Sequence, residues 1–204
     1  MRGRAGWATD IGLLAVGTAV FFYQALLMRG TFFVQDVMVQ NYPFRDFFTR
    51  ALQSGALPLW DAAINCGFPL FAEGQAGVFY PFNFFSYWLL PTYASLNLNI
   101  IAHIWWAGVG AYAFLRVLGC VRLAALTGGV SYAFSGYLSI RAMSPNYIDA
   151  AAWMPFIFLC FELATRRRRW GYLSLAGGIA GLQYLAGHPQ AAVYAQGGAM
   201  LYGV

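Results

Sequence analysis

The sequence predicts an all-α protein, a polytopic bundle of transmembrane helices, and three observations support this fold class. Hydrophobic residues make up 60% of the 204 residues and charged residues only 9%, whereas soluble domains carry roughly 25% charged residues. Several apolar runs approach the length that crosses a bilayer. The basic residues are all arginine, and most of them flank these runs. We expect about six spans in a single membrane domain that covers residues 1–204.

The first apolar run, residues 11–28, contains 18 residues without a charge and is expected to be a retained signal anchor. At about 1.5 Å per residue it reaches roughly 27 Å, close to the thickness of the hydrocarbon core. A long loop, residues 29–92, follows it, and its last ten residues are too short to span. Five further spans are expected, at residues 93–115, 123–140, 147–165, 170–187 and 190–204. The chain stops within the last run, so we expect it to be the N-terminal part of a longer protein.

The arginines predict the orientation of these spans. With the N-terminus in the cytoplasm, eight arginines lie on the inner side and four on the outer side, as the positive-inside rule expects. The inner set is Arg2, Arg4, Arg116, Arg122 and the run 166–169, and the outer set is Arg29, Arg45, Arg50 and Arg141. This topology places residues 35–83, which carry four of the seven acidic residues, on the outer face.

An amphipathic helix is expected within the long outer loop, over residues 37–52. Phe44, Phe48 and Leu52 recur at helical spacing and define one apolar face. Such a helix would suit the membrane interface, with its phenylalanines toward lipid. Asp46 and Arg50 form an i,i+4 pair in the favourable order.

Asp36 is the first candidate for chemistry, because it lies just beyond the first span at the start of this helix. A carboxylate at the membrane surface can act as a general base toward an acceptor hydroxyl. It can also bind a divalent cation as a hard oxygen ligand. The alternative is a structural role as a helix N-cap or first-turn acid.

Four other polar residues are singled out by position. Glu73 lies in a glycine-flanked loop, where it either approaches a ligand or is a solvated acid. Asp149 lies where the fourth span meets the outer surface, so it faces a cavity or pairs with Arg141. His188 lies between two spans, where it binds phosphate, shuttles a proton or is simply exposed. His103 is expected to make an interhelical hydrogen bond.

Several classes of function are excluded or disfavoured. The arginines form no basic stripe on a soluble domain, so nucleic acid is not an expected partner. No glycine-rich phosphate loop with Lys and Ser/Thr is present, so ATP-driven transport is not indicated. Cys66, Cys120 and Cys160 have neither metal-site nor disulfide spacing. The arginine run 166–169 is expected to contact anionic lipid headgroups.

The loop carries a series of motifs in order. They are Asp36-x-x-x-Gln40-x-x-Pro43-Phe44, Gly55-Ala56-Leu57-Pro58-Leu59-Trp60-Asp61, Gly67-Phe68-Pro69-Leu70 and Gln75-x-Gly77-x-Phe79-Tyr80-Pro81-x-Asn83. Together with Gly187-His188-Pro189-Gln190, this pattern resembles the bacterial YfhO-like membrane protein family. The resemblance covers most of the chain, at the N-terminal part of a longer family pattern.

The resemblance implies the polytopic fold of type C glycosyltransferases in the bacterial cell membrane. Such enzymes move a sugar from a polyprenyl-phosphate carrier on the outer face, here to a cell-envelope polymer or glycan. An acidic residue of the first outer loop serves as base or metal ligand, and Asp36 is the position that fits. The residues then expected to bind substrate are Glu73, Gln40, Gln75, Arg45, Arg141, Asp149 and His188. The carrier phosphate would be held by Arg29, Arg45 or Arg141, or by a divalent cation.

Two other functional classes remain open at this point. A transporter or flippase would move a lipid-linked sugar without forming a bond, but its polar site is expected near the bilayer midplane on broken helices. An assembly or anchoring protein would carry no chemistry. Formation of a sugar-modified acceptor from an added lipid-linked sugar separates the three.

Overall fold

The computed structural model describes residues 2–32 and 36–203 of the chain. Every regular element in this part of the chain is a helix, and an isolated antiparallel bridge pairs Asp61 with Phe68. The all-α prediction is therefore confirmed.

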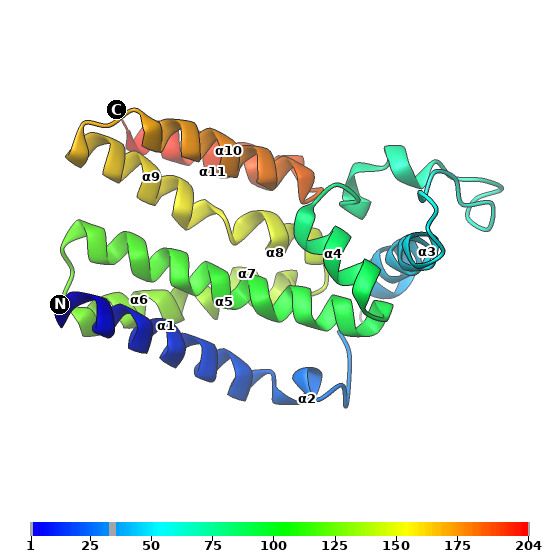
Figure 1. Ribbon diagram of the computed structural model, residues 1–204, viewed down its shortest axis with the longest axis horizontal. Helices are drawn as coiled ribbons and strands as arrows, with labels where there is room; N and C mark the ends of the chain where they lie inside the picture. The colour runs from blue at the N-terminus through cyan, green and yellow to red at the C-terminus, as the bar shows by residue number, and fades with distance from the viewer. Residues whose placement is uncertain (1, 33–35, 204) are drawn as a thin grey trace.

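The long helices lie side by side as a bundle, with the marked N- and C-termini at the same end (Figure 1). The helices that run lengthwise are α1 (Arg2–Phe21), α5 (Thr92–Leu118), α6 (Arg122–Ala133), α9 (Met154–Arg167), α10 (Gly171–Leu185) and α11 (Pro189–Tyr202). Helix α5 is central and packs against α1, α6, α8 and α9. The short helix α2 (Tyr23–Leu26) follows α1.

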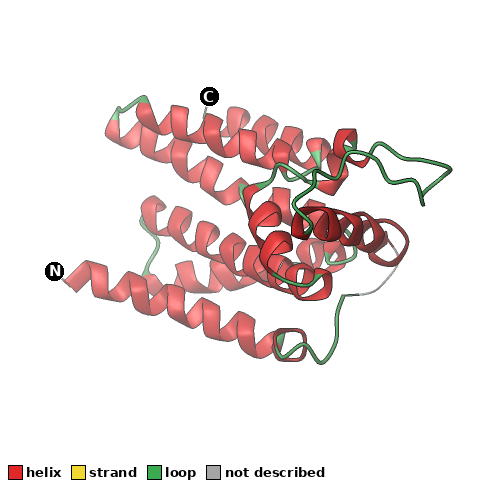
Figure 2. Ribbon diagram, turned by 45° about the vertical axis from the view of Figure 1, so that its right-hand side comes forward, coloured by secondary structure: helices red, strands yellow, loops and turns green. Residues whose placement is uncertain are grey.

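Residues 36–89 form a cap on the bundle, at the end opposite to both termini, as Figures 1 and 2 show. The cap begins with the π-helix η1 (Val37–Asn41), which continues directly into α3 (Tyr42–Gln53). An irregular loop follows, with the short 3₁₀ turns η2 (Leu70–Ala72) and η3 (Gly74–Ala76). The cap ends with α4 (Pro81–Leu89).

The prediction of about six spans requires correction. Two helices in the described chain are long and apolar enough to cross a membrane, Thr92–Leu118 and Pro145–Arg167. They correspond to the expected spans at 93–115 and 147–165. Helices α10 and α11 have 15 and 14 residues. At about 1.5 Å per residue, each reaches only roughly 20 Å, short of the roughly 30 Å hydrocarbon core.

Local sequence signals break the other apolar runs. The run at 123–140 divides into α6 and α7 (Gly136–Arg141), because the Ser135 side chain caps α7 by accepting the N–H of Leu138. Helix α8 (Pro145–Ala151) passes into α9 through a turn, and Pro155 lies in the first turn of α9, where its missing N–H is tolerated. The run at 11–28 is interrupted at Phe22, after which α2 begins.

The cap has an apolar core of its own. Phe44, Phe48 and Leu52, on one face of α3, are buried against Leu70 and Tyr87 of the same cap. The expected amphipathic helix is therefore present, but its phenylalanine face packs on protein. The prediction that this face turns toward lipid is wrong, because the loop after α3 folds back to cover it.

Close approach of α5 and α6 depends on small residues. A Cβ added to Gly129 would lie 2.9 Å from the carbonyl oxygen of Gly108, and one added to Gly108 would lie 3.1 Å from the Cβ of Ala133. Glycines at both contact points let the two backbones touch, which is a common basis of helix packing in membranes.

Candidate functional site at the capped end

A buried ion pair joins the cap to the bundle. The Nη2 atom of Arg45 in α3 lies 3.5 Å from Oδ2 of Asp149 in α8, and both side chains are almost completely excluded from solvent. The Nη1 atom of Arg45 donates a 2.9 Å hydrogen bond to the hydroxyl of Tyr87 in α4. Burial by itself would lower the pKa of Arg45, but Tyr87 and Asp149 raise it above its usual value. The guanidinium therefore stays charged inside the protein.

A directed chain of hydrogen bonds lies close to this pair, because Nδ1 of His103 is 3.5 Å from Oδ1 of Asp149. The indole N–H of Trp153 donates to the Tyr80 hydroxyl at 2.7 Å, and that hydroxyl lies 2.6 Å from Nε2 of His103. The Nδ1 atom of His103 lies 2.7 Å from the carbonyl oxygen of Asn99, which can only accept. When His103 carries its single proton on Nδ1, the donor of each of these three hydrogen bonds has an acceptor. An interhelical hydrogen bond was expected for His103; its partner outside α5 is Tyr80, the residue that immediately precedes α4.

The ion pair is only partly satisfied. Among the described residues, Nε of Arg45 and Oδ1 of Asp149 have no hydrogen-bond partner. The Oδ1 atom lies 3.5 Å from Nδ1 of His103, but the proton on that nitrogen is directed to the Asn99 carbonyl. A buried pair with unpaired atoms contributes little net stability, so its main effect is to specify where the cap sits.

The surface beside this pair presents Asp36. Its side chain is exposed, and Oδ2 accepts a 2.9 Å hydrogen bond from the hydroxyl of Ser144. The backbone N–H of Ser144 in turn donates to the carbonyl oxygen of Arg141 at 2.8 Å. One turn, residues 141–144, therefore holds the Asp36 carboxylate and carries the Arg141 side chain.

A stacked group extends from the same turn. The guanidinium of Arg141 lies 4.1 Å from the ring centroid of Tyr147, and the Tyr147 and His188 ring centroids are 3.3 Å apart. His188 caps α11, because its Nδ1 atom accepts the N–H of Ala191 at 3.2 Å. Burial, with a smaller contribution from the charge of Arg141, lowers the pKa of His188. Nδ1 is therefore kept as an unprotonated acceptor.

The glycine-flanked loop around Glu73 docks on the α10–α11 connection. Gly187 has a φ of +91°, and a Cβ there would lie 2.5 Å from the carbonyl oxygen of Gly74. Glu73 caps η3 by accepting the N–H of Ala76 at 2.9 Å. The structure thus gives Glu73 a local capping role, while Gln75 is exposed beside it.

The sequence-predicted site residues fall into two groups. Asp36, Arg141 and His188 lie at the capped end, linked through the turn at 141–144 and the Tyr147 ring. Arg45 and Asp149 lie inside and are engaged with each other, so the expectation that Asp149 pairs with Arg141 is wrong. Their burial also removes them from contact with a substrate at the surface. Gln40 lies half-buried in η1, and Arg29 is exposed before the cap.

Sequence reasoning missed three residues that organise this end, namely Ser144, Tyr147 and Tyr87. Ser144 precedes Pro145, and Ser at the N-cap followed by Pro at the first helical position is a signal for the start of a helix. The tyrosines carried no such signal, because Arg45 is distant in sequence from Tyr87, and His188 from Tyr147.

The described carboxylates and imidazoles of this end do not form a cluster. Within the described part of the chain, no three His, Cys, Asp or Glu side chains gather closely enough to hold one. The neighbours of the Asp36 carboxylate are a hydroxyl and the arginine-bearing turn.

Comparison with protein families identifies a family for this chain. The family model described as "Bacterial membrane protein YfhO" matches residues 12–180, which include the cap, the turn at 141–144 and most of the bundle. Searches of curated proteins and of solved structures gave no match.

Proposed function

The chain belongs to the YfhO family of bacterial membrane proteins, and from this we propose that it is a membrane glycosyltransferase. In this proposal it moves a sugar from a polyprenyl-phosphate carrier to a cell-envelope acceptor on the outer face. The N-terminus then lies in the cytoplasm and the cap faces outward, in accord with the eight-to-four distribution of arginines.

One observation carries the proposal. The exposed carboxylate of Asp36 is held at 2.9 Å by Ser144, in the turn that also bears Arg141. Sugar transfer from a lipid phosphate needs a base for the acceptor and a cation for the leaving group. The turn anchors the base, Asp36, and carries the cation, Arg141.

The reaction proceeds by displacement at the anomeric carbon. Asp36 takes the proton of the acceptor hydroxyl, and the acceptor oxygen forms a bond to the anomeric carbon. The bond between that carbon and the phosphate oxygen breaks, and its electron pair leaves with the lipid phosphate. Arg141 stabilises the leaving phosphate, because the Tyr147 ring covers one face of its guanidinium and leaves the N–H edges available for paired hydrogen bonds.

The test is sugar transfer by the purified protein in proteoliposomes, with a radiolabelled polyprenyl-phosphate sugar and a cell-envelope acceptor. Asp36→Asn should reduce the rate by about 10²–10⁴-fold, the usual contribution of a general base. Ser144→Ala should reduce it less, because the carboxylate remains but loses its anchor.

Asp46→Asn is the matched control. Asp46 is a second cap carboxylate, and its partners Arg50 and Thr92 are structural. Its replacement should leave transfer within a few-fold of the original rate. Undiminished transfer by Asp36→Asn would remove Asp36 from the mechanism. Movement of the labelled lipid across the bilayer without a new product would favour the flippase alternative.

A further inference from the structure

The four consecutive arginines at 166–169 divide into two pairs. Arg166 forms an ion pair with Glu162, and Nη1 of Arg167 donates a 2.8 Å hydrogen bond to the Tyr172 hydroxyl. Among the described residues, the guanidinium groups of Arg168 and Arg169 have neither a hydrogen bond nor an ion pair. Two positive charges are thus left available at this end of the bundle.

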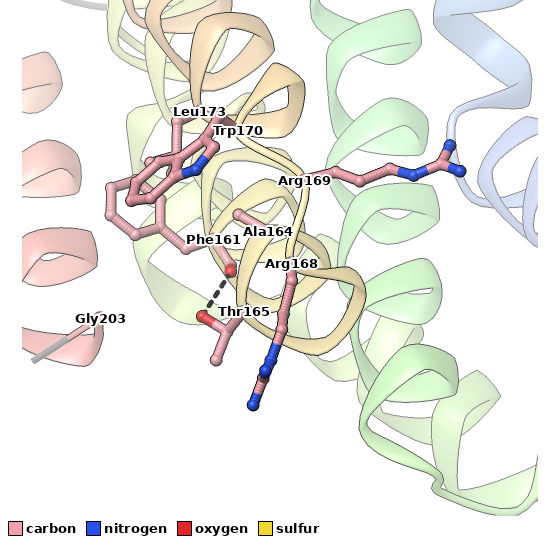
Figure 3. Close-up of a pocket in the computed structure, with 8 residues that line it drawn as sticks. All are labelled: Phe161, Ala164, Thr165, Arg168, Arg169, Trp170, Leu173 and Gly203. Carbon is pink, nitrogen blue, oxygen red and sulfur yellow. Dashed lines mark hydrogen bonds between the residues drawn. The ribbon is translucent and has the colours of Figure 1, made fainter.

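These two free arginines border a cavity of about 520 Å³ at the end opposite the cap. A cavity of this size falls within the range of ligand sites. The cavity is lined by Phe161, Ala164, Thr165, Arg168, Arg169, Trp170, Leu173 and Gly203. In Figure 3 the Trp170 ring lies beside Phe161, while the side chains of Arg168 and Arg169 extend outward in different directions.

The walls and the rim of the cavity differ in chemistry. Phe161, Trp170 and Leu173 give an apolar surface, and Trp170 is 82% exposed. Such exposure of an indole in a membrane protein is typical of the headgroup level of the bilayer. The rim carries the two unpaired guanidinium groups, whose planar donors match phosphate oxygens.

The position of the cavity matches that of a lipid headgroup. It lies at the C-terminal end of Pro145–Arg167, one of the two helices long enough to span. A basic pocket between helices, at the level where a span leaves the hydrocarbon core, suits an anionic lipid.

We propose that this cavity binds an anionic phospholipid. Its acyl chain lies along Phe161, Trp170 and Leu173. The exposed side chains of Arg168 and Arg169, which extend in different directions without a ligand, turn toward its phosphate. This binding is independent of sugar transfer and occurs at the other end of the molecule. It fixes the ends of α9, α10 and α11 to one lipid leaflet.

Native mass spectrometry of the delipidated protein, titrated with phosphatidylglycerol or phosphatidylcholine, tests the proposal. Arg168→Gln with Arg169→Gln should weaken phosphatidylglycerol binding roughly 30-fold, from the typical contribution of two arginines near an anionic surface. Arg166→Gln with Arg167→Gln removes the same charge from the same run and should weaken binding only a few-fold. Phosphatidylcholine binding should respond little to either change.

Three outcomes would overturn the proposal. Equal loss in the two double variants would mean diffuse electrostatic attraction in place of a site. Displacement of the lipid by inorganic phosphate at equal concentration would indicate a simple anion site. Unchanged binding in Trp170→Ala would remove the apolar wall from the contact. The single variants Arg168→Gln and Arg169→Gln provide the same comparison if the double variant does not fold.

Discussion

The guanidinium of Arg45 lies 3.5 Å from the carboxylate of Asp149, across 104 residues of sequence, and this contact seats the cap on the bundle. Arg45 belongs to α3, the amphipathic helix of the cap. Asp149 belongs to α8 and lies five positions after Ser144. Because Ser144 anchors Asp36, the buried pair also positions the carboxylate proposed as base.

Removing one member of this pair should destabilise the protein strongly. Arg45→Met leaves Asp149 buried without a cation, and Asp149→Leu leaves the guanidinium without an anion. Each is expected to lower the free energy of unfolding by about 3–5 kcal/mol. The double variant should lose much less than the sum, because no charge is then left unpaired. Unfolding by SDS in mixed micelles measures all three, and additive losses would show that the two residues do not act together.

Tyr80→Phe tests the directed hydrogen-bond chain. The change leaves the Trp153 indole N–H without an acceptor and Nε2 of His103 without a donor, at about 1–3 kcal/mol for each buried group. Exposed Tyr93→Phe is the control and should change stability by less than about 0.5 kcal/mol. In ¹⁵N NMR the His103 ring should show its proton on Nδ1. A proton on Nε2 would contradict the assigned direction.

The environment of His188 should make the stability of the protein depend on pH. Burial lowers its pKa in the folded protein below the usual value near 6.5, so the unfolded chain binds more protons at acidic pH. Its contribution to stability is therefore fully present above pH 6.5 and is lost as the pH falls through the lowered pKa. His188→Asn keeps a side chain that can cap α11 but cannot titrate. The variant should lose less stability between pH 7 and pH 5, measured by thermal unfolding; an equal loss would assign the effect elsewhere.

Two glycine-to-alanine changes should have opposite effects. Gly187→Ala places a Cβ 2.5 Å from the carbonyl oxygen of Gly74, at a φ of +91° that alanine rarely adopts. The loop around Glu73 should no longer pack against the α10–α11 connection, and proteolysis between residues 54 and 80 should become faster. Gly181→Ala, in helix α10 with nothing within 4 Å, should stabilise by about 0.5–1 kcal/mol. Equal protease resistance in both variants would rule out this docking.

Much of the helical framework was predictable from local pattern. The expected span at 93–115 lies within Thr92–Leu118, and the amphipathic helix at 37–52 corresponds to η1 and α3. Asp46 and Arg50 pair at 3.1 Å, as their i,i+4 spacing predicted. These features depend on neighbours within a few residues, which a single sequence records.

The sequence did not show which distant residues or surfaces a given side chain contacts. Periodicity shows that Phe44 and Phe48 share a face, but it does not tell whether lipid or protein covers that face. Asp149 had a nearby arginine at 141, and only the fold brings the more distant Arg45 to it. The break at Ser135 was hidden because the apolar run continues on both sides of it.

Val37 belongs to the bundle core, but the apolar core under α3 is separate, so the cap beyond η1 can exchange its amide hydrogens as a cooperative unit of its own. Opening the cap would expose the phenylalanines of α3 while leaving the packing around α5 intact. Such an opening is a local fluctuation far smaller than global unfolding, and it begins with the breaking of the contact between Arg45 and Asp149.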